Sequence, residues 1–135
     1  MARMTIALSA YDHVGLRVTD ARRSLAFYRE FGFEIDPDFT DDRVAEIVNV
    51  AGLRINLIFN GVAPPDGRNV LLDVPEKWPG YTHAAFIVEK LATILDWAAA
   101  RGIAITEGPV DWGRRITCFL RDPDGNVLEF NELKA

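Results

Sequence analysis

The only two histidines of this chain of 135 residues each take the third position of a similar segment. His13 lies in "YDHVGLRV" at residues 11–18, and His83 lies in "YTHAAFIV" at residues 81–88. Alternating apolar and polar residues predict a half-buried strand for both segments, with each imidazole on the polar face. Two imidazoles at equivalent positions suit a borderline divalent metal ion.

Both segments belong to a duplicated unit. Leu25 aligns with Leu95 and Gly32 with Gly102 at the offset that relates the two histidines. After a short insertion, Asn56 aligns with Glu129. Each half reads as a strand, a helix and three further strands, and the first helix has Thr19 or Asp20 as a candidate N-cap.

The repeat predicts a single α+β domain over residues 1–135. It consists of two tandem βαβββ modules, at about residues 10–60 and 80–133, which form a cupped mixed sheet with the helices outside. The Pro- and Gly-rich stretch at 61–79 reads as a linker, with an extra strand at 69–74 left open. In the second module, residues 103–106 are expected to be a strand and residues 107–115 a loop.

Four residues fall on the polar faces of equivalent strands, namely His13, His83, Asn56 and Glu129. A local twofold axis would bring the first strands of the modules together and place their last strands nearby. We therefore expect His13, His83 and Glu129 to bind a metal ion, with Asn56 or water at a fourth position. This ligand set suits Zn, Ni, Mn, Co or Fe(II).

The stretches "DHVGLRVTDARRSLAFYREFGF" and "RDPDGNVLEFNE" resemble the vicinal oxygen chelate superfamily, and the resemblance covers residues 10–133. The local motifs are most similar to those of glyoxalase I. That resemblance implies a lyase or isomerase acting on a small substrate with neighbouring oxygens, with glutathione as a possible co-substrate. It gives Arg17 and Asn60 a glutathione-binding role. Asn56 departs from the pattern, since glyoxalase I has a carboxylate there, so any proton transfer would rest on Glu129.

Other activities of the superfamily stay open. Extradiol dioxygenases use two histidines and one glutamate on Fe(II), and fosfomycin thiol transferases share this triad and a similar "YTH" segment. Bleomycin-binding relatives are non-catalytic and generally lack the metal residues. Within the predicted loop, Trp112 and Arg115 lie where they could grip an anionic or aromatic substrate at the mouth of a pocket.

Composition limits the partners and the compartment. The net charge of −5 disfavours non-specific binding to nucleic acid or to an anionic membrane. One cysteine, Cys118, excludes an intramolecular disulfide and indicates a reducing compartment, and the N-terminus lacks a secretory pattern. We expect a cytoplasmic homodimer, in which the modules pair either within or across chains.

Overall fold

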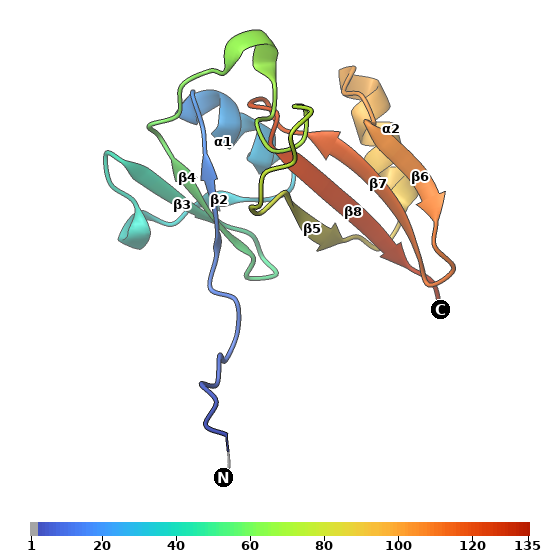
Figure 1. Ribbon diagram of the computed structural model, residues 1–135, viewed down its shortest axis with the longest axis horizontal. Helices are drawn as coiled ribbons and strands as arrows, with labels where there is room; N and C mark the ends of the chain where they lie inside the picture. The colour runs from blue at the N-terminus through green and yellow to red at the C-terminus, as the bar shows by residue number, and fades with distance from the viewer. Residues whose placement is uncertain (1–2) are drawn as a thin grey trace.

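The computed structural model describes residues 3–135 and confirms two βαβββ modules (Figure 1). The first module contains one helix and four strands: β1 (Val14–Arg17), α1 (Ala21–Arg29), β2 (Glu34–Ile35), β3 (Val44–Val48) and β4 (Arg54–Ile58). The second module repeats this order: β5 (His83–Ile87), α2 (Leu91–Arg101), β6 (Glu107–Asp111), β7 (Arg115–Arg121) and β8 (Val127–Leu133). Two 3₁₀ turns lie at Pro37–Phe39 and Pro65–Gly67.

Each module has its own four-stranded mixed sheet, in the orders β1-β4-β3-β2 and β5-β8-β7-β6. The first and last strands of each module pair in parallel. Parallel pairing requires a crossover connection between the two strands, and the helix is the first part of that connection. The two sheets lie side by side with the helices behind them in Figure 1. The opposite face of each sheet is therefore not covered by a helix and can carry a site.

Local chemistry sets the helix ends. The Asp20 carboxylate caps α1 by accepting a hydrogen bond from the Arg23 backbone N–H at 3.1 Å, which confirms one of the two predicted N-caps. Helix α2 ends at Gly102, whose φ of 66° is the left-handed conformation that glycine adopts without strain. No helix within residues 3–135 is long and apolar enough to cross a membrane.

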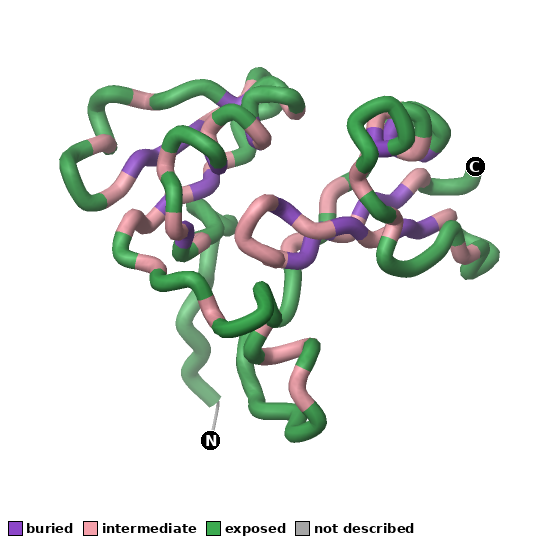
Figure 2. Tube along the Cα trace, turned by 90° about the horizontal axis from the view of Figure 1, so that it is seen from above, coloured by how far each residue is buried: buried purple, intermediate pink, exposed green. Residues whose placement is uncertain are grey.

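The core runs through both modules, and Figure 2 shows its buried residues concentrated in the strands and helices. Aromatic rings join the modules behind the sheets. The Phe31 ring, just after α1, lies 5.4 Å from the ring of Phe130 on β8 and 4.9 Å from the ring of Trp97 on α2. The Tyr28 hydroxyl donates a hydrogen bond to the buried Asp122 carboxylate at 2.7 Å. The modules of one chain are thus fastened through α1.

Two local predictions for the second module were wrong, and the extra strand left open at residues 69–74 does not form. Residues 103–106 form no strand. The alternation of Ile103 and Ile105 reflects packing of both side chains on the core, and not pairing of this segment in the sheet. The strand β6 instead occupies part of the predicted loop, at Glu107–Asp111. Residues 69–74 form turns, since the Asn69 side-chain oxygen accepts hydrogen bonds from the backbone N–H groups of Leu71 and Leu72.

Candidate metal centre

His83 and Glu129 come together on the open face of the second sheet. They lie on the parallel neighbours β5 and β8, and His83 Nε2 is 3.2 Å from Glu129 Oε1. The other imidazole nitrogen, Nδ1, lies 2.8 Å from the Thr82 hydroxyl. This contact fixes the ring orientation and leaves Nε2 directed at the carboxylate, which is how a metal-binding histidine is usually held.

A second pair of polar side chains fixes the Glu129 carboxylate. Asn131 Nδ2 donates to Glu129 Oε2 at 2.7 Å, and the Thr117 hydroxyl donates to Asn131 Oδ1 at 2.6 Å. Both Thr117 and Asn131 are buried, so the chain of hydrogen bonds is shielded from water. One oxygen of Glu129 is therefore anchored, and the other faces His83.

The spacing of these two atoms fits a shared divalent ion. Nitrogen and oxygen ligands lie about 2.0 to 2.2 Å from such an ion, so two neighbouring ligand atoms lie about 2.8 Å apart in octahedral geometry and up to about 3.6 Å apart in tetrahedral geometry. The observed separation of 3.2 Å between His83 Nε2 and Glu129 Oε1 lies within this interval. The donor set, one imidazole and one carboxylate, suits the first-row divalent metals.

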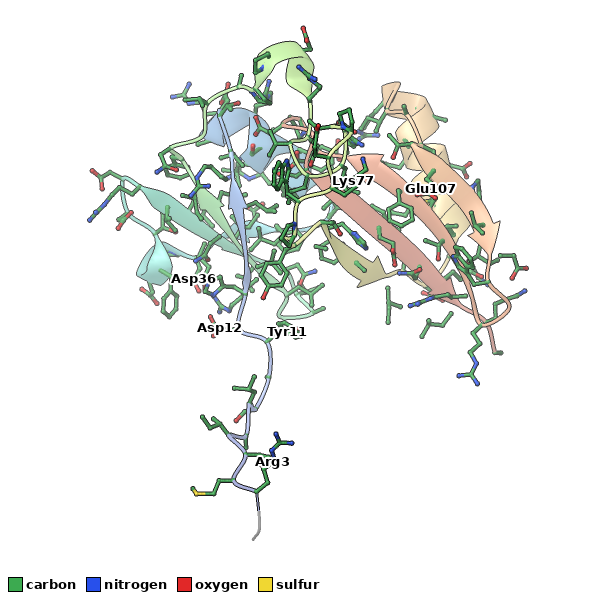
Figure 3. All side chains as sticks on the ribbon, in the orientation of Figure 1. Arg3, Tyr11, Asp12, Asp36, Lys77 and Glu107 are labelled. Atoms are coloured by element: carbon green, nitrogen blue, oxygen red, sulfur yellow. The ribbon has the colours of Figure 1, made fainter. Side chains whose placement is uncertain are left out.

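His13 lies on the other sheet, at the point where the N-terminal arm (residues 3–12) enters β1. Its Nδ1 is 2.7 Å from Asp12 Oδ2, a carboxylate–imidazole pair that orients the ring. One ligand atom each of Asp12, His13 and Glu46 lies within 4.8 Å of the others. Figure 3 labels Asp12 at the base of this sheet. Within residues 3–135 this is the one group of three or more potential metal-binding side chains so close together.

The three predicted metal ligands do not all meet within one chain. His83 contacts Glu129, whereas His13 belongs to the separate group on the first sheet. The reason is the packing of the modules, which join behind their sheets through α1. Each chain therefore presents two separate groups of potential metal ligands. The first half-site is Asp12, His13 and Glu46, and the second half-site is His83 and Glu129.

The predicted substrate-binding residues also divide between the sheets. On the first sheet, Arg17 Nε donates to Asn60 Oδ1 at 2.9 Å. Asn56, predicted to lie beside the metal, is on this sheet too, and no group within residues 3–135 bonds to its buried Oδ1. On the second sheet, an open depression of about 320 Å³ contains Glu129. The predicted residues Trp112 and Arg115 line it, together with Thr117 and Phe119. The Phe119 ring packs edge-on to His83 at 5.4 Å.

Sequence reasoning missed several residues of these half-sites. Asn131 and Thr117 lie on the open face by strand alternation, two residues from Glu129 and on its neighbouring strand. Glu46 is a charged residue inside the apolar strand β3, and that placement alone could have marked it. Cys118, in contrast, is buried, and burial raises the pKa of its thiol, so it offers no reactive thiolate.

The two tandem βαβββ modules are typical of a class of proteins that includes both enzymes and binding proteins. The family model of the Glyoxalase/Bleomycin resistance protein/Dioxygenase superfamily matches residues 10–130. The chain belongs to this superfamily, as its motifs predicted.

Curated relatives agree with this membership, and a solved structure shares the fold. The chain is 27% identical to a lactoylglutathione lyase of Salmonella typhimurium, over 90% of this chain and 91% of that one. It is 28% identical to a virulence protein of the same organism, over 90% and 82% of the two chains. A glyoxalase/dioxygenase structure from Nostoc punctiforme superposes with a TM-score of 0.72 at 21% identity, covering 98% of this chain and all of the other.

Proposed function

We propose that this protein is a divalent-metal-dependent enzyme of the vicinal oxygen chelate type, with a glyoxalase I-like lyase or isomerase activity. Its substrate is a small molecule with two neighbouring oxygens. The observation that carries the proposal is the His83–Glu129 pair, whose facing atoms are spaced as two ligands of one ion. The 27% identity with a lactoylglutathione lyase supports this choice among the activities of the superfamily.

The active unit in this proposal is a homodimer in which each metal centre is shared. His13 of one subunit joins His83 and Glu129 of the partner subunit, because the two half-sites of a single chain are apart. A twofold axis would then form two identical centres. The N-terminal arm supports such pairing, since it projects from the body in Figure 1 and leaves three apolar side chains almost fully exposed: Met4, Ile6 and Leu8.

The residues of the site divide the work. A bound divalent ion would act as a Lewis acid on the neighbouring oxygens of the substrate. Glu129 accepts the proton that the substrate releases, because its Oε1 faces the centre while Asn131 holds Oε2 in place. Thr82 and Asp12 keep the two imidazoles oriented.

Substrate recognition falls to residues around the centre. Arg17 provides a cation for a carboxylate of a glutathione-like co-substrate, and Asn60 holds the guanidinium in position at 2.9 Å. Trp112 and Arg115 border the depression that contains Glu129, where they can contact the apolar and anionic parts of a substrate. Asn56 lies on the same sheet as Arg17, and its buried amide oxygen lacks a partner.

A second candidate activity is extradiol-type ring cleavage. Two histidines and one carboxylate form the ligand set of many Fe(II) oxygenases, and Asn56 stands where a second carboxylate would distinguish glyoxalase I. Under this alternative the same three ligands bind Fe(II), and the substrate is a catechol.

Assays on purified protein separate these activities. The protein is loaded with Zn, Ni, Mn, Co or Fe(II) and tested with methylglyoxal plus glutathione, and with catechols. We expect turnover of the first substrate pair, and loss of both turnover and bound metal in His83→Ala. A wild-type protein that binds none of the metals near stoichiometry would refute the enzyme proposal and favour a non-catalytic binding protein.

A further inference from the structure

We infer that Glu46, on the neighbouring strand, supplies the carboxylate that Asn56 lacks, so that the first half-site contributes both His13 and Glu46 to the metal centre. This inference rests on the proposed function and assigns a further ligand to the same centre. It concerns a strand, β3, that carries none of the site residues predicted from the sequence.

The register of the two sheets shows that the carboxylate lies on different strands in the two modules. Glu46 on β3 pairs with Asn56 on β4, and the equivalent pair of the second sheet is Phe119 on β7 with Glu129 on β8. Each of these two pairs thus contains one carboxylate, but on different strands. Because directly paired residues face the same side of a sheet, Glu46 and Asn56 both point to one face.

The side chain of Glu46 reaches the predicted ligand His13. A carboxylate oxygen of Glu46 and ring nitrogen of His13 lie within 4.8 Å, although Asn56 and β4 separate their strands. The row from Glu46 through Asn56 continues to Gly15 on β1, and glycine has no side chain that could block this approach. The carboxylate can therefore lean across β4 toward the imidazole.

The environment of Glu46 suits a ligand more than a surface charge. The residue is 6% exposed, and a buried carboxylate requires a compensating cation. Arg54 Nη1 contacts Glu46 Oε2 at 2.6 Å and also contacts Asp36 Oδ2 at 2.9 Å. One guanidinium thus serves two carboxylates, and Glu46 Oε1 takes no part in that ion pair. A divalent cation between Glu46 and His13 would balance the remaining negative charge.

Asn56 gives an independent indication of a cation at this place. Its Oδ1 is buried, and no donor within residues 3–135 bonds to it. A buried amide oxygen without a partner is unfavourable by about 1 to 3 kcal/mol. Asn56 lies between Gly15 and Glu46 in this row, and Gly15 is two residues from His13 along the chain. A cation bound there would satisfy this oxygen, directly or through a bound water.

The test uses Co²⁺, whose visible absorption reports the number and type of its ligands. We expect the wild-type dimer to bind Co²⁺ and Glu46→Gln to bind it at least about 100-fold more weakly, because outer-sphere changes alone already cost about 10- to 100-fold. Adding Asn56→Glu to Glu46→Gln should restore affinity and spectrum, since it places the carboxylate where Glu129 stands in the other sheet. Glu34→Gln is the matched control, because Glu34 is an exposed, ion-paired glutamate of the same sheet.

The possible results separate this inference from the proposed function. If wild type binds Co²⁺ and Glu46→Gln binds it with equal affinity and spectrum, the inference is wrong and the shared centre of His13, His83 and Glu129 stands. A loss of binding that Asn56→Glu does not restore would also overturn it, because Glu46 would then act only by holding Arg54 in the fold. If wild type itself binds no Co²⁺, both proposals fail.

Discussion

Removing the Tyr28 hydroxyl should measurably loosen the connection between the modules. Tyr28 on α1 is 1% exposed, and its hydroxyl donates to Asp122 Oδ2 at 2.7 Å. Asp122 is buried as well, and its carboxylate accepts three further hydrogen bonds, from Asp124 N, Asn126 N and Asn126 Nδ2. Burial raises the pKa of the Asp122 carboxyl above its usual value, although these donors oppose the rise.

The expected magnitude follows from this geometry. A hydrogen bond to a charged group contributes about 1.5 to 3 kcal/mol, so Tyr28→Phe should lower the free energy of unfolding by about 2 kcal/mol. Asp122 keeps three donors, which limits the loss. For a domain of this size, that change lowers the melting temperature by roughly 5 to 10 °C.

Urea unfolding followed by circular dichroism at pH 7 provides the measurement. Tyr11→Phe is the matched control, because that tyrosine is 99% exposed and its hydroxyl makes no contact that matters for folding. Equal unfolding free energies for Tyr28→Phe, Tyr11→Phe and wild type would refute the reasoning. Asp122→Asn should be more destabilising than Tyr28→Phe. The new side-chain NH₂ group would face N–H and O–H groups that now donate to the carboxylate, and it cannot accept their hydrogen bonds.

Three further predictions concern acid stability, the core and metal linkage. Arg121 lowers the pKa of Asp73 to about 2. The contact therefore stabilises the fold fully above about pH 4, and this stabilisation is lost as the pH falls through 2. In urea titrations, the difference in unfolding free energy between wild type and Asp73→Asn should shrink over that pH interval. Leu57→Ala, at a fully buried position, should cost about 2 to 5 kcal/mol in the same unfolding assay. Metal at 100 times its dissociation constant should stabilise the dimer by about 2.7 kcal/mol in calorimetry, and excess chelator should remove this gain.

The fold was predictable because the sequence repeats itself. Equivalent residues such as Gly32 and Gly102 lie at the helix ends of both modules. Ile55 and Leu57 are two residues apart in a strand and both are buried, as apolar–polar alternation predicts. Alternation failed where burial and pairing differ. Ile105 packs on the core from an unpaired segment, and Leu53 is 45% exposed because it precedes β4 rather than lying within it.

The candidate site was only partly predictable. Strand alternation indicates which residues share a face, and it grouped His83 with Glu129 as the structure does. It does not indicate how two modules pack, so it could not separate His13 from that pair. Glu46 escaped notice for a related reason, since its approach to His13 crosses an intervening strand and depends on the register of three strands.

Mixing two inactive variants tests the shared centre most directly. His13→Ala and His83→Ala each remove one ligand from both centres of their own homodimer, so each should bind little metal alone. In a heterodimer of the two variants, one centre regains His13 from one subunit and His83 from the other, while the second centre lacks both. Unfolded together in equal amounts and refolded, the variants should recover about a quarter of the wild-type metal content, because about half of the dimers are mixed and each has one intact centre. A refolded mixture that binds no more metal than either variant alone would contradict a centre shared between subunits.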